Sequence, residues 1–196
     1  MTPTTSEIEF ATTSLLIALR AHDRETANHA VRVQTVALNM GRAMNLSGNQ
    51  LWALKIGSLL HDLGKLQTPD AILRKPTALT DEEWGTMRLH PYTGGMMLRA
   101  LNFPEPVCLI VEQHHEHWNG RGYPYGLAQD EISCGARILA VADSYDAIVS
   151  DRCYHPGESA PHGRTKILWD MGRQFDPRAV AAFLLLTSAG TNLAAA

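Results

Sequence analysis

The sequence predicts an all-α protein with a single domain. Apolar residues recur at spacings of three and four along most of the chain, whereas the alternation typical of β-strands is nearly absent. A length of 196 residues allows one domain with a sizeable core, and 45% hydrophobic with 19% charged residues is typical of a globular protein. We expect the domain to cover residues 8–186, between an N-terminal extension over 1–7 and a C-terminal tail over 187–196.

The first half of the chain predicts three long helices. The first runs from about residue 8 to residue 21 or 22, and the second from about 25 to 44 with Val33, Ala37 and Met40 on one apolar face. Ser47 has the residue type and place of an N-cap for the third helix, which should end at Gly64.

The second half contains further start signals, which are capping residues and prolines. They predict helices over about 80–87, 91–101, 104–115, 133–149 and 177–186, starting at Thr80 with Glu83, at Pro91, at Pro104 or Pro106, at Ser133, and at Asp176 with Pro177. The stretch 118–131 is rich in glycine, proline and aspartate, so we expect an ordered loop there.

Charge and cysteine usage exclude several classes of function. A formal net charge of -3 argues against a surface for polymeric nucleic acid, although a local basic pocket for a small phosphorylated ligand remains compatible with it. Cys108, Cys134 and Cys153 form no CxxC pair, a pattern typical of a reducing cytosol. No apolar run is long enough to cross a bilayer and residues 1–9 do not resemble a signal peptide, so we expect a cytoplasmic location without a membrane partner.

Histidine is unusually common, with nine copies against four phenylalanines, and it is the commonest metal ligand among side chains. Five imidazoles and three carboxylates are candidate ligands, more than one ion needs. The absence of thiolates favours iron, manganese or another octahedral metal over structural zinc. The candidates are Glu25, His29, His61, Asp62, His90, His114, His115 and Asp143.

Each candidate also has an ordinary explanation. Taken alone, Glu25 is more typical of an acid in a first helical turn, although four residues separate it from His29 and both can share one helix face. The pair His61-Asp62 follows apolar residues and should be partly buried, where a charge needs a metal or a counter-ion. For Asp143, in a buried helix face, burial alone favours a basic partner and a metal equally.

The order of these segments resembles the HD-GYP domains, a subgroup of the HD-domain phosphohydrolases. The resemblance includes His-Asp-Leu-Gly-Lys at residues 61–65 and the loop His-His-Glu-His-Trp-Asn-Gly-Arg-Gly-Tyr-Pro at 114–124. It covers roughly residues 8–186, and the other matching segments are 25–29, 69–73, 79–84 with 90–91, 137–143, 150–152 and 174–177.

The resemblance implies a single HD-type helical bundle with an ordered GYP loop, which hydrolyses cyclic di-GMP or, as in some members, cyclic GMP-AMP. Two or three divalent ions, iron or manganese, would be bound by the candidates above, with Asp62 bridging the central two and Glu25 as the extra ligand of three-metal members. Lys65 would act at the scissile phosphate, and Tyr123, Arg152 and His155 would lie at the dinucleotide. The products would be pGpG and, after a second cut, GMP.

Partners and alternatives also follow from the resemblance. HD-GYP domains usually follow a receiver or sensory domain, so such a domain or a signalling protein is an expected partner, and a homodimer is compatible with the sequence. Rival functions are a non-catalytic cyclic-dinucleotide receptor and an HD-type mononucleotide phosphohydrolase; Lys65 and the GYP loop disfavour a di-iron oxygenase. Three departures, Ala27, Cys153 and His155 in place of the usual glycine, proline and Lys or Arg, put affinity and substrate choice in doubt.

Overall fold

The computed structural model describes residues 3–151 and 157–188, and within these ranges it confirms the all-α class. Outside the helices, extended pairing is limited there to isolated bridges. None of the described helices is long and apolar enough to cross a membrane. The elements are α1 (Thr5–His22), α2 (Arg24–Ala43), α3 (Gly48–Leu60), η1 (Leu63–Gln67), α4 (Asp70–Leu73), α5 (Asp81–Met87), α6 (His90–Ala100), α7 (Glu105–Gln113), η2 (Gln129–Glu131), α8 (Cys134–Val149), α9 (Ala160–Trp169) and α10 (Pro177–Ser188).

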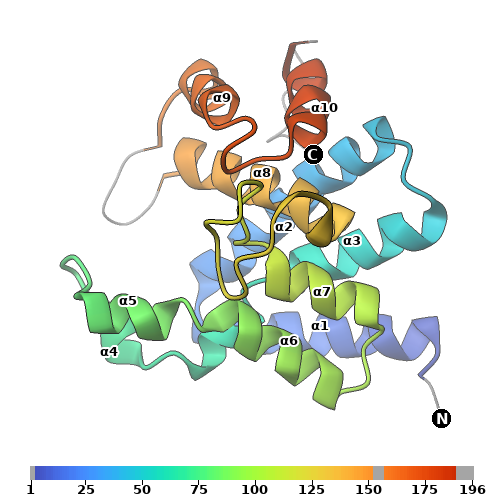
Figure 1. The fold of residues 1–196 in the computed structure, drawn as a ribbon. Helices are drawn as coiled ribbons and strands as arrows, with labels where there is room; N and C mark the ends of the chain where they lie inside the picture. Colours follow the sequence, from blue (N-terminus) through green and yellow to red (C-terminus); the bar gives the residue numbers. More distant parts are fainter. Residues whose placement is uncertain (1–2, 152–156, 189–196) are drawn as a thin grey trace.

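The bundle is organised around α2, which packs against α1, α3, α8 and α10, while α7 packs against α3, α6 and α8. Figure 1 shows α9 and α10 at one end of the molecule and α4, α5 and α6 at the other. Apolar side chains from the central helices form the core, and Leu54, Val107 and Leu139 are fully buried. Burying such a side chain contributes about 1.5–3 kcal/mol, so this core holds the ends of α3, α7 and α8 in fixed places.

Side-chain caps fix the starts of α1, α2, α3, α5 and α10. The predicted caps of α3 and α5 are confirmed, since Ser47 and Thr80 each form a capping box with the residue three positions later. The first helix begins at Thr5, earlier than the expected boundary at residue 8, because Thr4 forms a capping box with Glu7. At the last helix, Asp176 accepts a hydrogen bond from the backbone N–H of Arg178, as the Asp-Pro signal predicts.

Further features of the fold differ from the sequence-based expectation. Helix α3 ends at Leu60 and not at Gly64, and the short α4 was not predicted. Ser133 occupies the N-cap position of α8, but its hydroxyl makes no capping bond. Its backbone N–H instead donates to Oε1 of Gln113, at 2.8 Å, so a side chain from α7 fixes the start of α8. Helix α9 was not predicted, because Pro161 and Gly163 lower the helix propensity of its first turn. Proline is tolerated in that turn.

Candidate metal centre

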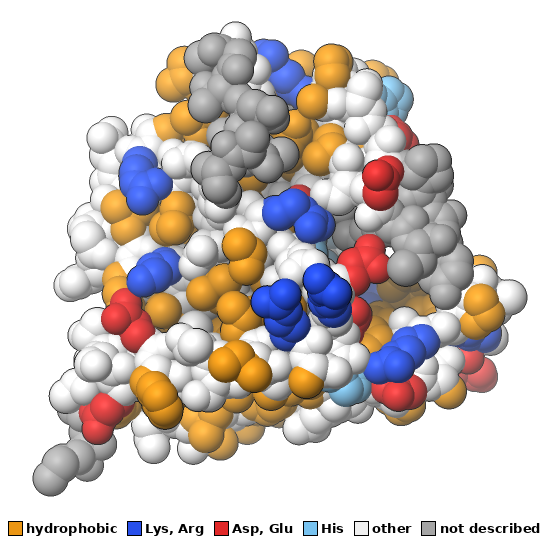
Figure 2. Space-filling view, turned by 180° about the vertical axis from the view of Figure 1, so that it is seen from behind, with side chains coloured by type: hydrophobic (Ala, Val, Ile, Leu, Met, Phe, Trp, Pro, Cys, Tyr) orange, Lys and Arg blue, Asp and Glu red, His pale blue; other side chains and the backbone are white. Residues whose placement is uncertain are grey.

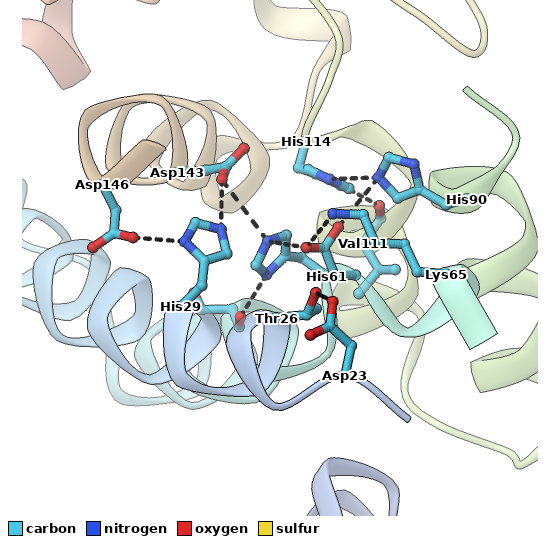
Figure 3. A network of polar contacts seen from close by, with 12 residues as sticks. Asp23, Thr26, His29, His61, Lys65, His90, Val111, His114, Asp143 and Asp146 are labelled. Carbon is cyan, nitrogen blue, oxygen red and sulfur yellow. Dashed lines mark hydrogen bonds and ion pairs between the residues drawn. The ribbon is translucent and has the colours of Figure 1, made fainter. Parts of the chain in front are cut away.

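The candidate ligands come from five places in the bundle, and all of them lie where helices begin, end or cross. His29 lies in α2, His61 and Asp62 follow α3, and Asp143 lies in α8. The remaining histidines are at the start of α6 and directly after α7. Figure 3 shows the side chains from α2, α3, α6 and α8 pointing toward one another.

The structure brings these side chains into three adjacent groups, in each of which the donor atoms lie within 4.8 Å of one another. Two residues belong to two groups each, so the groups form one continuous cluster rather than separate sites. This arrangement is the one expected for neighbouring metal ions. The groups are His29 with His61 and Asp143, His61 with Asp62 and His114, and His90 with His114 and His115.

Backbone carbonyl groups fix the tautomer of three of the histidines. In His61, His90 and His114, Nδ1 lies 2.7–2.8 Å from the carbonyl oxygen of the residue three positions earlier. Because a carbonyl oxygen only accepts, Nδ1 must carry the proton and Nε2 keeps its lone pair for a metal. The Nε2 atom of His61 is buried without a hydrogen-bond partner, an arrangement that costs free energy unless a metal ion satisfies it.

For His29, a carboxylate and not a backbone carbonyl group fixes the orientation of the ring. Nδ1 of His29 donates to Oδ2 of Asp146 at 2.6 Å, and Nε2 lies 2.9 Å from Oδ1 of Asp143. Asp146 is held in turn by Arg32, whose Nε and Nη2 each donate to it at 2.8 Å. The ring of His29 is thereby fixed with its Nε2 beside Asp143, as a shared metal would require.

Burial keeps the deep histidines neutral. It lowers the pKa of His90 and of His115 to about 3, and it lowers the pKa of His114 well below its usual value. Neutral imidazole is the form that binds metal ions. At neutral pH these rings therefore need no deprotonation before they act as ligands.

The carboxylates of the cluster remain charged. Burial raises the pKa of Asp62 and of Asp143, but Lys65 beside the first and the hydrogen bond from His29 to the second outweigh it and hold both values below the usual range. Burial opposes protonation of His29, yet its bonds with Asp143 and Asp146 raise the pKa of His29 to about 9. At neutral pH a protonated His29 therefore balances these carboxylates, and a divalent cation would take over that role, with His29 binding it as neutral imidazole.

Lys65 and Gly64 complete the segment that follows α3. Nζ of Lys65 donates to Oδ2 of Asp62 at 2.7 Å, while the lysine side chain stays 24% exposed. Gly64 has no room for a side chain, because a Cβ atom there would lie 2.0 Å from the carbonyl oxygen of His90. The glycine therefore allows η1 to pack directly on α6, which brings Asp62 and His90 together.

The predicted loop over 118–131 closes one side of the cluster. The ring of Tyr123 stacks on the ring of His115, with 4.9 Å between the ring centroids. The backbone N–H of Tyr123 donates to the carbonyl oxygen of His115 at 3.1 Å. The guanidinium carbon of Arg88 lies 5.6 Å from the centroid of the Tyr123 ring, a cation–π arrangement. Tyr123 thus connects the cluster with an exposed cation.

Comparison with known proteins agrees with this geometry. The family model described as "HD domain" matches residues 14–179. The chain belongs to the HD-domain family. This HD domain is 40% identical, over 172 residues, to a cyclic di-GMP phosphodiesterase of Pseudomonas aeruginosa, covering 86% of this chain and 41% of that protein. It is 36% identical to the cyclic di-GMP phosphodiesterase response regulator RpfG of Xanthomonas campestris, covering 85% of this chain and 45% of the relative.

A solved structure shares the fold. The HDG"Y"P protein Bd1817 of Bdellovibrio bacteriovorus superposes with a TM-score of 0.71 at 17% identity, covering 94% of this chain and 65% of the other. This likeness, together with the family match, confirms the HD-type helical bundle expected from the sequence. The chain spans less than half the length of the curated relatives described above.

Within the described residues, three predicted site residues are not among the grouped ligands of the HD domain, and these are Glu25, Lys65 and Tyr123. Glu25 is exposed and lines an open pocket of about 760 Å³ beside α2, together with Arg24, Asn28 and Arg32. Its place as a ligand stays a prediction. Arg152 and His155 lie outside the described residues. Figure 2 shows acidic and basic side chains gathered around a hollow near the middle of one face of the molecule.

Two residues that hold the ligands or the adjacent loop in place could hardly be predicted from the sequence. Asp146 follows Asp143 by one helical turn, and this spacing on a buried helix was the only available signal. Glu116, next to the histidine pair, is 2% exposed, whereas its charge alone is typical of a solvated position. The role of Asp146 depends on a partner 117 residues away, and that of Glu116 depends on the path of an irregular loop.

Proposed function

We propose that this HD domain is a metal-dependent phosphodiesterase that hydrolyses cyclic di-GMP, or a related cyclic dinucleotide such as cyclic GMP-AMP. For cyclic di-GMP the product would be linear pGpG and, after a second cut, GMP. The observation that carries the proposal is the continuous histidine and aspartate cluster with Lys65 hydrogen-bonded to its central carboxylate. The names of the curated relatives support the same substrate class.

The donor set fits two adjacent divalent ions. Asp62 is suited to bridge them, because its Oδ2 lies 3.5 Å from Nε2 of His61 and its Oδ1 lies 3.4 Å from Nε2 of His90. Nitrogen and oxygen donors without thiolates favour iron or manganese. When bound, such ions activate water as a nucleophile and offset the negative charge of phosphate oxygens.

Lys65 is the residue that we propose to act on the transition state. Its ammonium group is fixed by Asp62 at the edge of the cluster and remains partly exposed, so a phosphate oxygen can reach it. Negative charge increases on the phosphate oxygens during attack, and a preorganised cation stabilises that charge more than it stabilises the ground state. Tyr123 would pack against the ligand from the side of the GYP loop. Arg152 and His155 remain proposed contacts to the dinucleotide.

Glu25 would bind a third ion, as the resemblance to three-metal HD-GYP domains implies. It lies one helical turn before His29 and borders the open pocket beside α2. A third positive charge there would favour docking of the terminal phosphate of the linear product, and thus the second hydrolysis to GMP. This part of the proposal concerns the final product and leaves the first cleavage unchanged.

Regulatory partners belong to the proposal as well. One curated relative is named a response regulator, which supports a receiver domain or a separate signalling protein as the partner of this HD domain. A homodimer is a further proposal, and sedimentation velocity on the purified chain would test it.

The decisive experiment is a turnover assay on anaerobically purified protein reconstituted with Mn(II) or Fe(II). Cyclic di-GMP, cyclic GMP-AMP and a mononucleotide would be offered separately and the products identified by chromatography. We expect linear dinucleotide from at least one cyclic substrate, and none from Asp62→Ala. Tight binding of a cyclic dinucleotide without turnover would indicate a receptor instead. Hydrolysis of the mononucleotide alone would indicate a mononucleotide phosphohydrolase.

A further inference from the structure

A buried carboxylate next to the metal cluster does not belong to it. Glu116 follows His114 and His115 directly and is 2% exposed, yet it is in none of the ligand groups among the described residues. Burying a charged group is costly unless other groups compensate for it. The compensation in this case comes from the loop that carries Tyr123.

Glu116 accepts hydrogen bonds from three consecutive backbone N–H groups of the loop. Its Oε1 accepts from Tyr125 at 2.7 Å and from Gly126 at 3.2 Å, and its Oε2 accepts from Leu127 at 3.0 Å. Hydrogen bonds to a charged acceptor are stronger than neutral ones. One side chain therefore holds the loop segment that comes directly after Tyr123-Pro124.

The part of the loop at Gly122 and Tyr123 also contacts the segment 115–117. A Cβ atom on Gly122 would lie 2.2 Å from the backbone nitrogen of His117, so the loop backbone rests directly on the residues that follow the histidine pair. The backbone N–H of Tyr123 donates to the carbonyl oxygen of His115. The tyrosine is thus held on both sides by residues 115–117.

We infer that Glu116 is a positioning residue, which orders the GYP loop so that Tyr123 stays stacked on His115 and faces the substrate. His115 contacts the cluster and Glu116 contacts the loop, so two neighbouring residues couple the metal centre to the substrate-binding wall. This inference rests on the proposed function for its effect on substrate. The order of the loop can be tested without it.

Glu116→Gln is the sharpest perturbation, because it keeps the size of the side chain and removes its charge. A glutamine amide has one oxygen, and its NH₂ group would face a backbone N–H where the carboxylate accepted one. We expect KM for the cyclic dinucleotide to rise roughly tenfold, while kcat changes by less than about threefold and metal content is unchanged. The matched control is Glu131→Gln, since exposed Glu131 accepts from only one N–H, that of Ala128, in the same loop.

A double-mutant cycle separates positioning from a general loss of structure. If Glu116 acts through Tyr123, then Glu116→Gln should change KM little in a Tyr123→Ala background. Additive effects of the two substitutions, or a loss of metal and kcat together with unchanged KM, would overturn the inference. Should Glu116→Gln fail to fold, Glu116→Asp keeps the charge with a shorter reach and should show the same coupling to Tyr123.

Limited proteolysis provides a readout that does not depend on activity. Arg121 lies in the loop and is exposed, so trypsin can cleave after it once the loop opens. We expect faster cleavage there in Glu116→Gln than in the wild type or Glu131→Gln. Equal cleavage rates would refute the role of Glu116 in the loop. A wild type that is protected from trypsin but does not hydrolyse any cyclic dinucleotide would refute the proposed function alone.

Discussion

Asp146→Asn tests how the protein prepares His29 to bind a metal. The substitution keeps the shape of the side chain and removes the charge that accepts the 2.6 Å bond from Nδ1 of His29. The same carboxylate receives two bonds from Arg32, at 2.8 Å each. Oδ2 accepts from His29 and from Nη2 of Arg32, and Oδ1 accepts from Nε of Arg32, so the NH₂ group of an asparagine would oppose a donor in either orientation. The bond that remains to His29 would come from a neutral acceptor, which is weaker than a carboxylate. The ring of His29 should therefore lose its fixed orientation.

The expected magnitude follows from the burial and the charge of this contact. Asp146 is 5% exposed, so little water can replace the lost acceptor. Removing a partner that orients a metal-bound histidine typically weakens metal affinity 10- to 100-fold, which corresponds to about 1.4–2.7 kcal/mol. Only the ion that we propose between His29 and Asp143 should be affected. Turnover at saturating metal should remain within a few-fold of the wild type, because no reacting group is removed.

Metal titration of the chelator-treated protein by calorimetry is the appropriate assay. The matched control is Asp130→Asn, because Asp130 also pairs with arginines, Arg137 and Arg178, but contacts no histidine. We expect one weakened binding step in Asp146→Asn and unchanged binding in the control. If Asp146→Asn binds every ion with wild-type affinity, then the orientation of His29 does not depend on Asp146 and the reasoning is wrong.

Four further predictions follow from the site and the core. Lys65→Ala should lower kcat at least tenfold with little change in KM or metal content, because the ammonium is proposed to act on the transition state; steady-state kinetics with metal analysis checks this. Chelation should lower Tm by about 5–10 °C, since bound ions stabilise only the folded state, and differential scanning calorimetry measures the shift. Glu25→Ala should remove about one ion per chain and make pGpG accumulate, as metal analysis and product chromatography would show. Gly57→Ala should destabilise the fold by about 1–3 kcal/mol in urea unfolding. The reason is that the new Cβ would lie 2.6 Å from Cγ2 of Ile110.

Each of these predictions has an outcome that contradicts it. Near-normal kcat in Lys65→Ala would show that the lysine is structural, and an unchanged Tm after complete removal of metal would exclude a stabilising metal site. A Glu25→Ala variant with its full metal content and product ratio would make Glu25 a helix-start residue and the site binuclear. Gly85→Ala is the control for Gly57, since apart from its chain neighbours and its own helix backbone no heavy atom of the described residues lies within 4 Å of its Cβ position. It should stabilise the helix by about 0.5–1 kcal/mol, and equal effects at both glycines would contradict the packing explanation.

The sequence by itself determined the helical class, most helix starts and the chemical identity of the candidate ligands. These features depend on contacts within about four residues, such as the capping boxes of Ser47 and Thr80 and the apolar spacing of α2. Burial of His61-Asp62 could also be predicted, because apolar residues precede the pair. The order of the motifs along the chain added the family resemblance.

Only the tertiary structure decided which atom of each ligand faces the cluster and what holds it there. The bonds of His29 reach residues 114 and 117 positions away, and no local pattern reports on contacts of that length. Glu116 contacts backbone N–H groups only 9 to 11 residues further along the chain, but no helix or strand spacing reports on an irregular loop that folds back over a side chain. For Glu25, spacing from His29 allows a shared helix face and the side chain borders the pocket beside α2, so its place as a ligand stays a prediction. Local spacing limits which side chains can meet, and the packing of the bundle selects which of them do.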